Sequence, residues 1–248
     1  MFTKKCFLAP LSPSSHKFNR GIVGILAGSD DYPGAAVLCV GGARRGGVGY
    51  VKFIRQSKIS SQLIYNYFPD VVQIPEFKGE SFDAIVVGPG NPKIMKIPQG
   101  VPVILDSSAI ASLDIKRNPI TILTPHEGEL KYLGYSLTSR TETAQRIADD
   151  LGVILVLKGS HTIVAAPGLA QLIDSTGGAE LSTAGSGDIL AGLIGAMIAS
   201  WKPTNLAQTQ EITFKAVQMH SRAGKKARKR NNPVVATDIL EVLPSINL

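Results

Sequence analysis

Short runs of aliphatic residues alternate along the chain with longer stretches in which apolar residues recur every three or four positions. The short runs predict buried strands at residues 21–28, 48–54, 70–76, 83–90, 101–108, 120–126 and 153–159. The longer stretches predict helices at residues 29–47, 56–69, 139–152, 189–200 and 207–230, with a short last helix at 237–244. This alternation is typical of an α/β fold in three layers, with a mostly parallel central sheet and helices on both faces.

Local signals refine this order of elements. Residues 162–168 and 169–175 predict an antiparallel pair that turns at Pro167 and Gly168. Ser29 or Asp30 is expected to begin the first helix, and Thr237 to cap the last, because their side-chain oxygens accept hydrogen bonds from free helical amides. Only about ten residues separate GPGN from VPVILD, which is short for a crossover helix, so a bare loop is expected there.

The composition indicates one large folded domain. The chain has 248 residues, of which 44% are hydrophobic and 18% charged, so a sizeable core can form and wholesale disorder is excluded. No linker or internal repeat interrupts it, and we expect a single domain over residues 1–248. Cys6 and Cys39 are too few for a disulfide framework. Because we find neither a signal peptide nor a membrane span, a cytoplasmic location is expected.

A basic cluster near the C-terminus accounts for much of the net charge of +7. In SRAGKKARKRNNP the cations of Lys225 to Arg230 lie at the end of a predicted helix, where the helix dipole favours positive charge. No aromatic residues alternate with them, so we expect no nucleic-acid partner. A catalytically inactive, RNA-binding protein remains an alternative, which predicts an RNA affinity that depends strongly on salt.

Six polar or glycine-rich loops follow the predicted strands or a strand-rich region. In parallel sheets ligands bind beyond the carboxyl ends of the strands, so these loops are expected to converge on one site. The loops have the sequences GSDDYPG, GPGN, DSSA, TPHEGE, KGSH and TAGSGD.

The most informative loop is TAGSGDILAG, which places Asp188 between a glycine-rich turn and a strongly apolar helix. Glycines at 185 and 187 let backbone amides approach a ligand, and the start of a helix attracts phosphate. A carboxylate beside that phosphate could take a proton from a hydroxyl that attacks a phosphoryl group. Alternatively, Asp188 simply caps the helix.

The loop TPHEGEL combines a helix-start signal with an unexplained histidine. Thr124, Pro125 and Glu127 have the spacing of a capping box with proline at the first helical position. His126 has no part in that box, so it either orients a polar substrate or is a structural histidine.

Two further strand ends carry charged side chains. Lys158 in KGSH could reach a phosphate, with Gly159 letting backbone approach a nucleotide, or it could be an ordinary turn lysine. Asp106 could orient a substrate hydroxyl or a magnesium-bound water, or form a turn. The chain has no zinc-ligand spacing, GxSxG elbow, Walker A loop or GxGxxG fingerprint, which excludes those common chemistries.

Taken in order, GSDDYPGAA, VVGPG, TPHEGEL, LKGSHTIVAAP and TAGSGDILAG make the chain similar to the ADP/ATP-dependent NAD(P)H-hydrate dehydratases, a branch of the ribokinase-like superfamily. The resemblance implies a ribokinase-like fold and a repair reaction. NADH or NADPH hydrated at C6 of the nicotinamide ring (NADHX or NADPHX) would be phosphorylated on the ring hydroxyl at the expense of ADP or ATP. Loss of phosphate would then restore NAD(P)H.

The resemblance also implies a role for individual residues. Asp188 would be the general base. The nucleotide would contact Lys158, Gly159, Ser160, His161, Thr162, Gly185, Ser186 and Gly187. The hydrated substrate would contact Ala35, Ala36, Gly88, Gly90, Asp106, His126, Glu127 and Asp188. No metal ligand is assigned, because Mg²⁺ would be carried by the nucleotide.

The chain departs from the usual pattern of the family at three places. Ala184 replaces a glycine, Asp106 is followed by SSA instead of the family's ADAL or ADGL, and the connection before VPVILD is short. No fused epimerase domain is expected, so an NAD(P)H-hydrate epimerase would be a separate chain, and a homo-oligomer, by resemblance a tetramer, is expected. A ribokinase-like small-molecule kinase is the alternative function, because such a kinase would also use Asp188 as its base, although it would lack the TPHEGEL loop.

Overall fold

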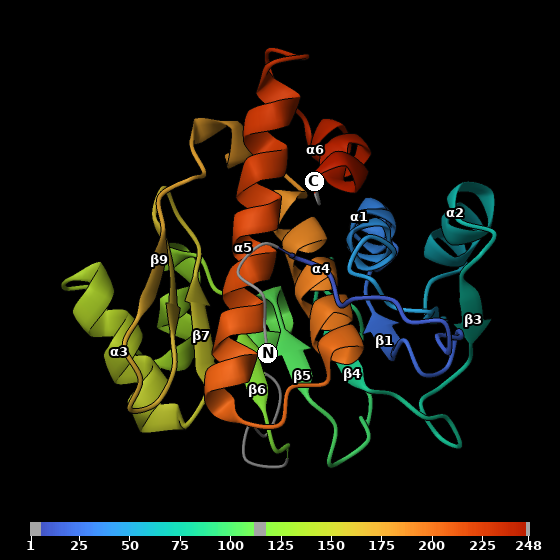
Figure 1. Ribbon diagram of the computed structural model, residues 1–248, viewed down its shortest axis with the longest axis horizontal. Coiled ribbons are helices and arrows are strands. Elements are labelled where there is room, and N and C mark those ends of the chain that lie inside the picture. Colours follow the sequence, from blue (N-terminus) through green and yellow to red (C-terminus); the bar gives the residue numbers. More distant parts are fainter. Residues whose placement is uncertain (1–5, 112–117, 247–248) are drawn as a thin grey trace.

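The computed structural model describes residues 6–111 and 118–246, and within these ranges a nine-stranded sheet forms the centre of the molecule (Figure 1). The strands lie in the order β3-β2-β1-β4-β5-β6-β7-β8-β9. Neighbours from β3 to β7 are parallel, whereas β8 pairs antiparallel with both β7 and β9. The antiparallel pair predicted after KGSH is therefore confirmed. The strands are β1 (Ile22–Leu26), β2 (Tyr50–Ile54), β3 (Val72–Ile74), β4 (Ala84–Val87), β5 (Val103–Leu105), β6 (Thr121–Leu123), β7 (Ile154–Leu157), β8 (Thr162–Ala165) and β9 (Leu172–Asp174).

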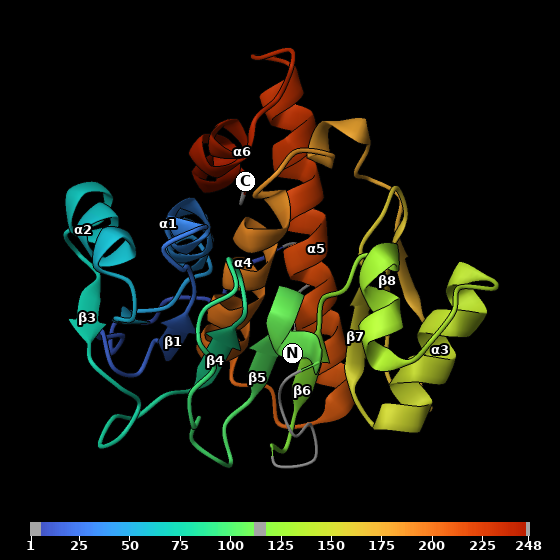
Figure 2. The same ribbon diagram turned by 180° about the vertical axis from the view of Figure 1, so that it is seen from behind.

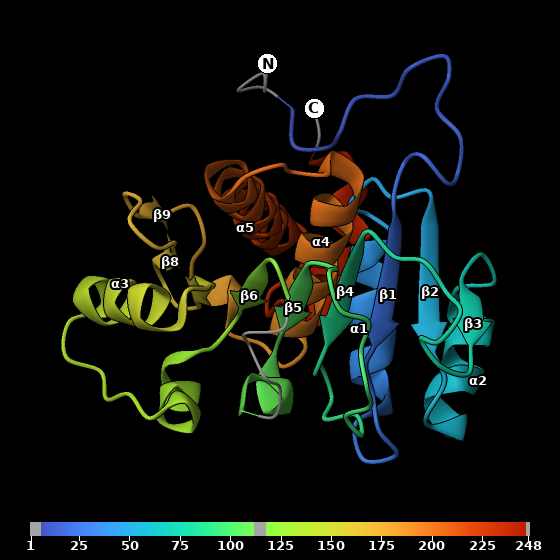
Figure 3. The same ribbon diagram turned by 90° about the horizontal axis from the view of Figure 1, so that it is seen from below.

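Helices cover both faces of this sheet, as the sequence predicts. In Figure 1, α4 and α5 lie in front of the strands and α1 lies above β1, and Figure 2 shows the sheet from behind, with α3 beside β7 and β8. Figure 3 looks along the layers from below. The helices are α1 (Pro33–Ala43), α2 (Lys58–Tyr67), α3 (Arg140–Leu151), α4 (Ser186–Trp201), α5 (Leu206–Arg228) and α6 (Ala236–Val242). Short 3-10 helices are η1 (Ser107–Ala111), η3 (Glu127–Leu133), η4 (Ala179–Leu181) and η5 (Leu243–Ser245). No helix in the described ranges is long and apolar enough to cross a membrane.

The two faces of the sheet have separate hydrophobic cores because successive strand residues point in opposite directions. In β4, Ala84 and Val86 pack into the core beneath α1, α4 and α5, whereas Ile85 and Val87 pack into the core on the α3 side. All four residues of β4 are buried, which explains why the strand reads as a continuous aliphatic run.

Glycines bring α1 and α4 unusually close together. A Cβ atom on Gly192 would lie 1.9 Å from the carbonyl oxygen of Cys39, and one on Gly42 would lie 2.2 Å from that of Ile189. A Cβ on Gly195 would likewise lie 2.2 Å from Cγ2 of Val86 in the sheet beneath. Helix α4 is therefore held in the core at a fixed distance from α1 and β4, with its first turn at the carboxyl end of the sheet.

Two predicted helix starts are wrong. Helix α1 begins at Pro33 rather than at residue 29, because Ser29 is held in the preceding loop: its hydroxyl donates to the carbonyl of Gly90 at 2.8 Å. Helix α6 begins at Ala236, and the side chain of Asp238 accepts a hydrogen bond from the amide of Val235 at 2.9 Å, so Thr237 is not the cap. The predicted loop before β5 is confirmed, since residues 91–102 contain no helix.

The capping box predicted in TPHEGEL is also wrong, because the observed box begins two residues later in the chain, at His126. The hydroxyl of Thr124 donates to Oδ1 of Asp106 at 2.6 Å and is therefore used in the site rather than at a helix end. The short helix η3 begins at Glu127, and the backbone amide of His126 donates to Oε2 of Glu129 at 2.8 Å. Glu129 thus takes the capping role that the sequence assigned to Glu127.

Candidate active site

The order of the strands reverses between β1 and β4, and the loops leaving these two strands meet there. The amide of Gly28 donates to the carbonyl of Pro89 at 2.7 Å, which ties the two loops together. Gly90 has a φ of +70°, and a Cβ atom on it would lie 2.6 Å from Cβ of Ala35. Such a switch point is where open α/β sheets bind ligands. The structure thus brings Ala35 and Gly90 side by side, as the sequence predicts for two residues of one site.

These loops form one wall of a cavity of about 580 Å³, which we call the β1–β4 cavity. Its size is in the usual range for small-molecule sites. Its lining includes Tyr32, Ala35, Gly90, Asn91, Ser107 and Asp188.

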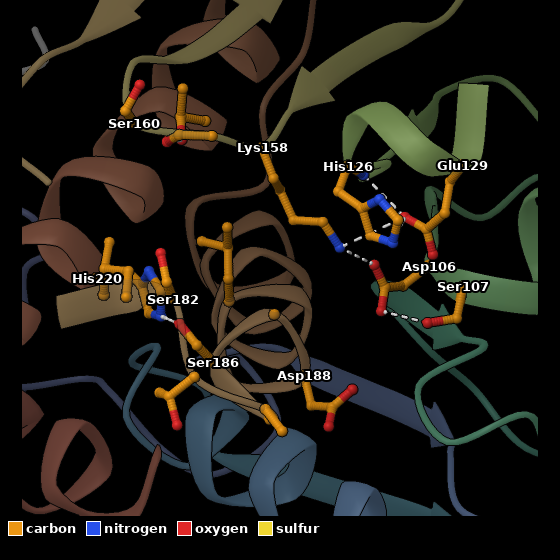
Figure 4. Close-up of a pocket in the computed structure, with 18 residues that line it drawn as sticks. Asp106, Ser107, His126, Glu129, Lys158, Ser160, Ser182, Ser186, Asp188 and His220 are labelled. Carbon is orange, nitrogen blue, oxygen red and sulfur yellow. Dashed lines mark hydrogen bonds and ion pairs between the residues drawn. The ribbon is translucent and has the colours of Figure 1, made fainter. Parts of the chain in front are cut away.

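A second cavity of about 550 Å³, the glycine-turn cavity, lies next to it (Figure 4). Its lining includes the strand-end residues Lys158, Gly159, Ser160 and Thr162 and the whole segment 181–188. Asp188, Gly185, Ala184 and Ser107 line both cavities. The loops at 158–162 and 183–188, which are distant in sequence, are therefore brought together as the sequence predicts, and Asp188 lies in the wall between the two cavities.

The turn before α4 has the geometry of an anion-binding site. Gly185 occupies the N-cap position with a φ of +90°, and a Cβ on it would lie 2.2 Å from Cδ1 of Leu38. Only glycine satisfies both conditions. The first amides of α4 have no partners within the helix, and the dipole of this 16-residue helix is positive here. The turn can therefore hold a phosphate by its backbone.

Asp188 is the third residue of α4, so the alternative that it caps the helix is wrong. In Figure 4 its carboxylate lies away from Lys158 and Asp106, and none of the residues drawn hydrogen-bonds to it. Burial raises the pKa of this carboxyl from 3.8 to about 7; the negative charge of Asp106 adds to the rise, and Lys158 opposes it. A carboxylate with a pKa near neutrality is well suited to accept a proton.

Lys158 is held by two other carboxylates. Its ammonium lies 2.8 Å from Oδ1 of Asp106 and 3.9 Å from Oε2 of Glu129. Burial alone would lower the pKa of Lys158, but these two charges and the hydrogen bond to Asp106 raise it, so the side chain stays charged. A Cβ atom on Gly187 would lie 3.2 Å from this ammonium, which places the positive charge directly beside the anion-binding turn.

His220, on α5, contacts the same turn. Its Nε2 atom lies 3.2 Å from Oγ of Ser186, the first residue of α4. Burial lowers the pKa of His220 to about 4, so its ring is neutral near pH 7. The ring contacts the turn without placing a second positive charge there.

Four residues that the sequence assigned to the site line neither of these cavities. Ala36 is fully buried, with its Cβ directed at Gly28, and Gly88 has its Cα packed against the carbonyl of Asp106. Glu127 forms an ion pair with Arg140, on the outside of η3. The ring of His161 is exposed and lies 3.3 Å from the hydroxyl of Ser160.

Conversely, the glycine-turn cavity includes residues that the sequence analysis missed. Glu129 could have been found from the i, i+3 spacing to His126, had the start of η3 been placed correctly. Ser107 follows directly on Asp106 in a loop already singled out. His220 gave no local signal, because it reaches the site by tertiary packing of α5. The other missed lining residues are Leu181, Ser182, Thr183, Ala184 and Leu190.

The basic cluster at the end of α5 is partly paired with nearby groups. Arg228 lies 3.6 Å from Glu180, and the ammonium of Lys226 donates to the carbonyl of Ser245 at 3.3 Å. Lys225 and Lys229 are exposed in the last turns of the helix, where cations complement the dipole.

Among the residues that the structure describes, no group of three or more His, Cys, Asp or Glu side chains could hold a metal ion. Within the site, Asp106 and Glu129 are already engaged by Lys158.

The fold and the site together define a ribokinase-like protein. A ribokinase-like superfamily protein from Enterococcus faecalis V583 superposes with a TM-score of 0.84 at 23% identity, over 96% of this chain and 90% of the other. At 23% identity, the match is evidence for the fold alone. The match therefore supports the α/β fold described above.

The chain belongs to the NAD(P)H-hydrate dehydratase family, whose model matches residues 23–245. The crystal structure of the ADP/ATP-dependent NAD(P)H-hydrate dehydratase from Bacillus subtilis, co-crystallised with ATP/Mg²⁺, is 29% identical with a TM-score of 0.84, over 96% of this chain and 93% of the other. The bifunctional NAD(P)H-hydrate repair enzyme Nnr of Mycobacterium tuberculosis (strain CDC 1551 / Oshkosh) is 34% identical over 79% of this chain. The chain covers 44% of the length of that relative.

Proposed function

We propose that this protein dehydrates hydrated NADH or NADPH back to NAD(P)H at the expense of ADP or ATP. The observation that carries the proposal is the position of Asp188, between two cavities and beside a backbone anion site. A kinase-like site needs a base at the point where an acceptor hydroxyl meets the terminal phosphate. Membership of the dehydratase family supports a hydrated nicotinamide as the acceptor.

In this proposal the nucleotide occupies the glycine-turn cavity. Lys158, Gly159, Ser160 and Thr162 line it from the end of β7, and the turn at 185–187 would hold the transferred phosphate. Mg²⁺ would arrive on the phosphates of the nucleotide, where it would neutralise negative charge. The ammonium of Lys158, already charged beside Gly187, can turn from Asp106 toward a phosphate.

The hydrated ring would occupy the β1–β4 cavity, against Ala35 and Gly90, whereas His126 lines the neighbouring glycine-turn cavity. Asp188 takes the proton of the C6 hydroxyl, and the hydroxyl oxygen bonds to the terminal phosphorus as the bond from phosphorus to the bridging oxygen breaks. The C6–O bond then breaks, and phosphate leaves with its electron pair, as the lone pair of the ring nitrogen stabilises the developing positive charge. Loss of a proton from C5 restores the double bond. Phosphorylation converts a poor leaving group, hydroxide, into a good one.

Other features of the proposal come from the family resemblance. We propose that residues 1–248 act as one dehydratase domain in a cytoplasmic homotetramer, and that a separate epimerase supplies the reactive epimer. The contacts assigned to Ala36, Gly88, Glu127 and His161 would be made through backbone or after local movement, since their side chains do not reach the two cavities.

The direct test is to incubate the protein with hydrated NADH and either ADP or ATP, and to follow the recovery of the dihydronicotinamide absorbance. We expect recovery that depends on the nucleotide and releases one phosphate for each NADH formed. Phosphorylation of an unrelated small alcohol, with no recovery from either nucleotide, would point instead to a ribokinase-like kinase.

The pH dependence of the reaction should reveal the base. Because the pKa of Asp188 is raised to about 7, its carboxyl is protonated and inactive below that pH. We expect kcat/KM to rise about tenfold per pH unit at acidic pH and to level off above about pH 7. The profile should be measured with the nucleotide held saturating. A flat profile between about pH 5 and about pH 9 would contradict the assignment.

A further inference from the structure

A third cavity, which the proposed reaction leaves without a role, lies between η1, η3 and the loop at Asn91. It has a volume of about 700 Å³, and we call it the η3 cavity. Its lining includes Asn91, Ser107, Ser108, His126, Lys131 and Tyr132.

The η3 cavity borders the other two. It shares Asn91 and Ser107 with the β1–β4 cavity, and Ser107, His126 and Glu129 with the glycine-turn cavity. A molecule that presents one end to Asp188 and passes Ser107 would therefore reach the η3 cavity, which lies apart from the strand-end residues 158–162.

The junction of the cavities has a strained backbone. Asn91 and Ser107 have φ values of 52° and 50°, in the left-handed region that side chains other than glycine rarely adopt. Such conformations are energetically unfavourable and cluster at ligand-binding sites. Both residues line the β1–β4 cavity as well as the η3 cavity.

The far wall of the η3 cavity presents an aromatic ring and a positive charge. The side chain of Tyr132 is 56% exposed, although it is large and apolar. The ammonium of Lys131 lies 5.2 Å from the centre of this ring, over one face, and has no carboxylate within 4 Å among the described residues. The exposed part of the ring is available to stack with a planar group, and the ammonium is available to bind an anion.

We propose that the η3 cavity binds the adenosine-phosphate half of the dinucleotide substrate, with the base stacked on Tyr132 and a phosphate beside Lys131. This proposal rests on the function proposed above and names the part of the substrate that lies away from the reacting ring. Stacking of a base on an aromatic side chain strengthens binding by about tenfold or more. The subsite would hold the dinucleotide while the nicotinamide ring reacts.

The test compares a full and a truncated substrate. For Tyr132→Ala we expect KM for hydrated NADH to rise about tenfold, with kcat and the KM for ADP unchanged. With hydrated, reduced nicotinamide mononucleotide, which lacks the adenylate half, the variant and the wild type should be equal. Lys131→Gln should weaken only the dinucleotide and reduce the salt dependence of its KM. Tyr65→Ala, at a 53% exposed tyrosine on α2, is the matched control and should behave as wild type.

Equal rises in KM for both substrates, or no rise for either, would overturn the subsite. If the wild type turns over no hydrated nicotinamide, the proposed function fails, and equilibrium binding of NADH then tests the subsite independently. Binding weakened about tenfold by Tyr132→Ala but not by Tyr65→Ala would support the subsite, and equal binding by all three proteins would refute it.

Discussion

Replacing Asp188 with Asn is expected to lower kcat about 10³-fold, while the Kd for ADP stays within a few-fold of the wild-type value. The amide cannot accept the proton of the ring hydroxyl, so the oxygen remains a poor nucleophile. The backbone turn at 185–187 and Lys158, which would hold the phosphates, are unchanged. Turnover should be measured with hydrated NADH, and nucleotide binding by calorimetry.

Asp150→Asn is the control for this variant, because that carboxylate lies on α3 and accepts a hydrogen bond from Tyr135 instead of facing the site. It should keep wild-type turnover. Retention of more than about a tenth of wild-type kcat by the Asp188 variant would remove the general-base role.

The same substitution should also change the pH dependence of stability. With a pKa raised from 3.8 to about 7, folded Asp188 keeps a proton that the unfolded chain releases in this interval. The free energy of unfolding of the wild type therefore falls as pH rises from about 4 to about 7. Asparagine removes this cost, so the variant should have the higher Tm above pH 7. A lower Tm there would show that the carboxylate stabilises the fold.

The second large effect is expected at the contact between α1 and α4. Gly192→Ala should lower the free energy of unfolding by about 3 kcal/mol, because the new methyl group would lie 1.9 Å from the carbonyl oxygen of Cys39. The backbone cannot give way as a side chain would, so the two helices must separate. Urea denaturation would measure the loss.

Gly34→Ala is the matched control, since Gly34 also lies in a helix but has no atom near its would-be Cβ. It should be neutral or slightly stabilising, as alanine favours helix by up to about 1 kcal/mol over glycine. Equal stability of the two variants would mean that α1 and α4 can separate at little cost. Because α4 carries Asp188, Gly192→Ala should also lower activity in the fraction that remains folded.

The elements were predictable wherever the local pattern and the packing agree. Strand β4 is buried on both sides and reads as a continuous aliphatic run, and α4 is apolar all round because α1, α5 and the sheet surround it. The glycine turn at the start of α4 was predictable as well, since Gly185 and Gly187 interrupt the local pattern just before a strongly apolar helix.

Helix starts and part of the site could not be predicted, because distant contacts decide them. Ser29 has the residue type of a cap, but the loop after β4 takes its hydroxyl. Thr124 has the spacing of a capping box, but Asp106, 18 residues earlier, accepts its hydrogen bond. His220 enters the site from a helix 34 residues beyond Ser186. In each case the deciding partner is brought close by the fold and leaves no trace in the local sequence.

The position of Asp188 in a wall common to two cavities affects the order in which the nucleotide and the hydrated substrate can bind. The nucleotide and the hydrated ring would each reach the carboxylate through a separate cavity, the glycine-turn cavity and the β1–β4 cavity. Either could therefore bind first, and the spent nucleotide could leave while the phosphorylated ring is still bound.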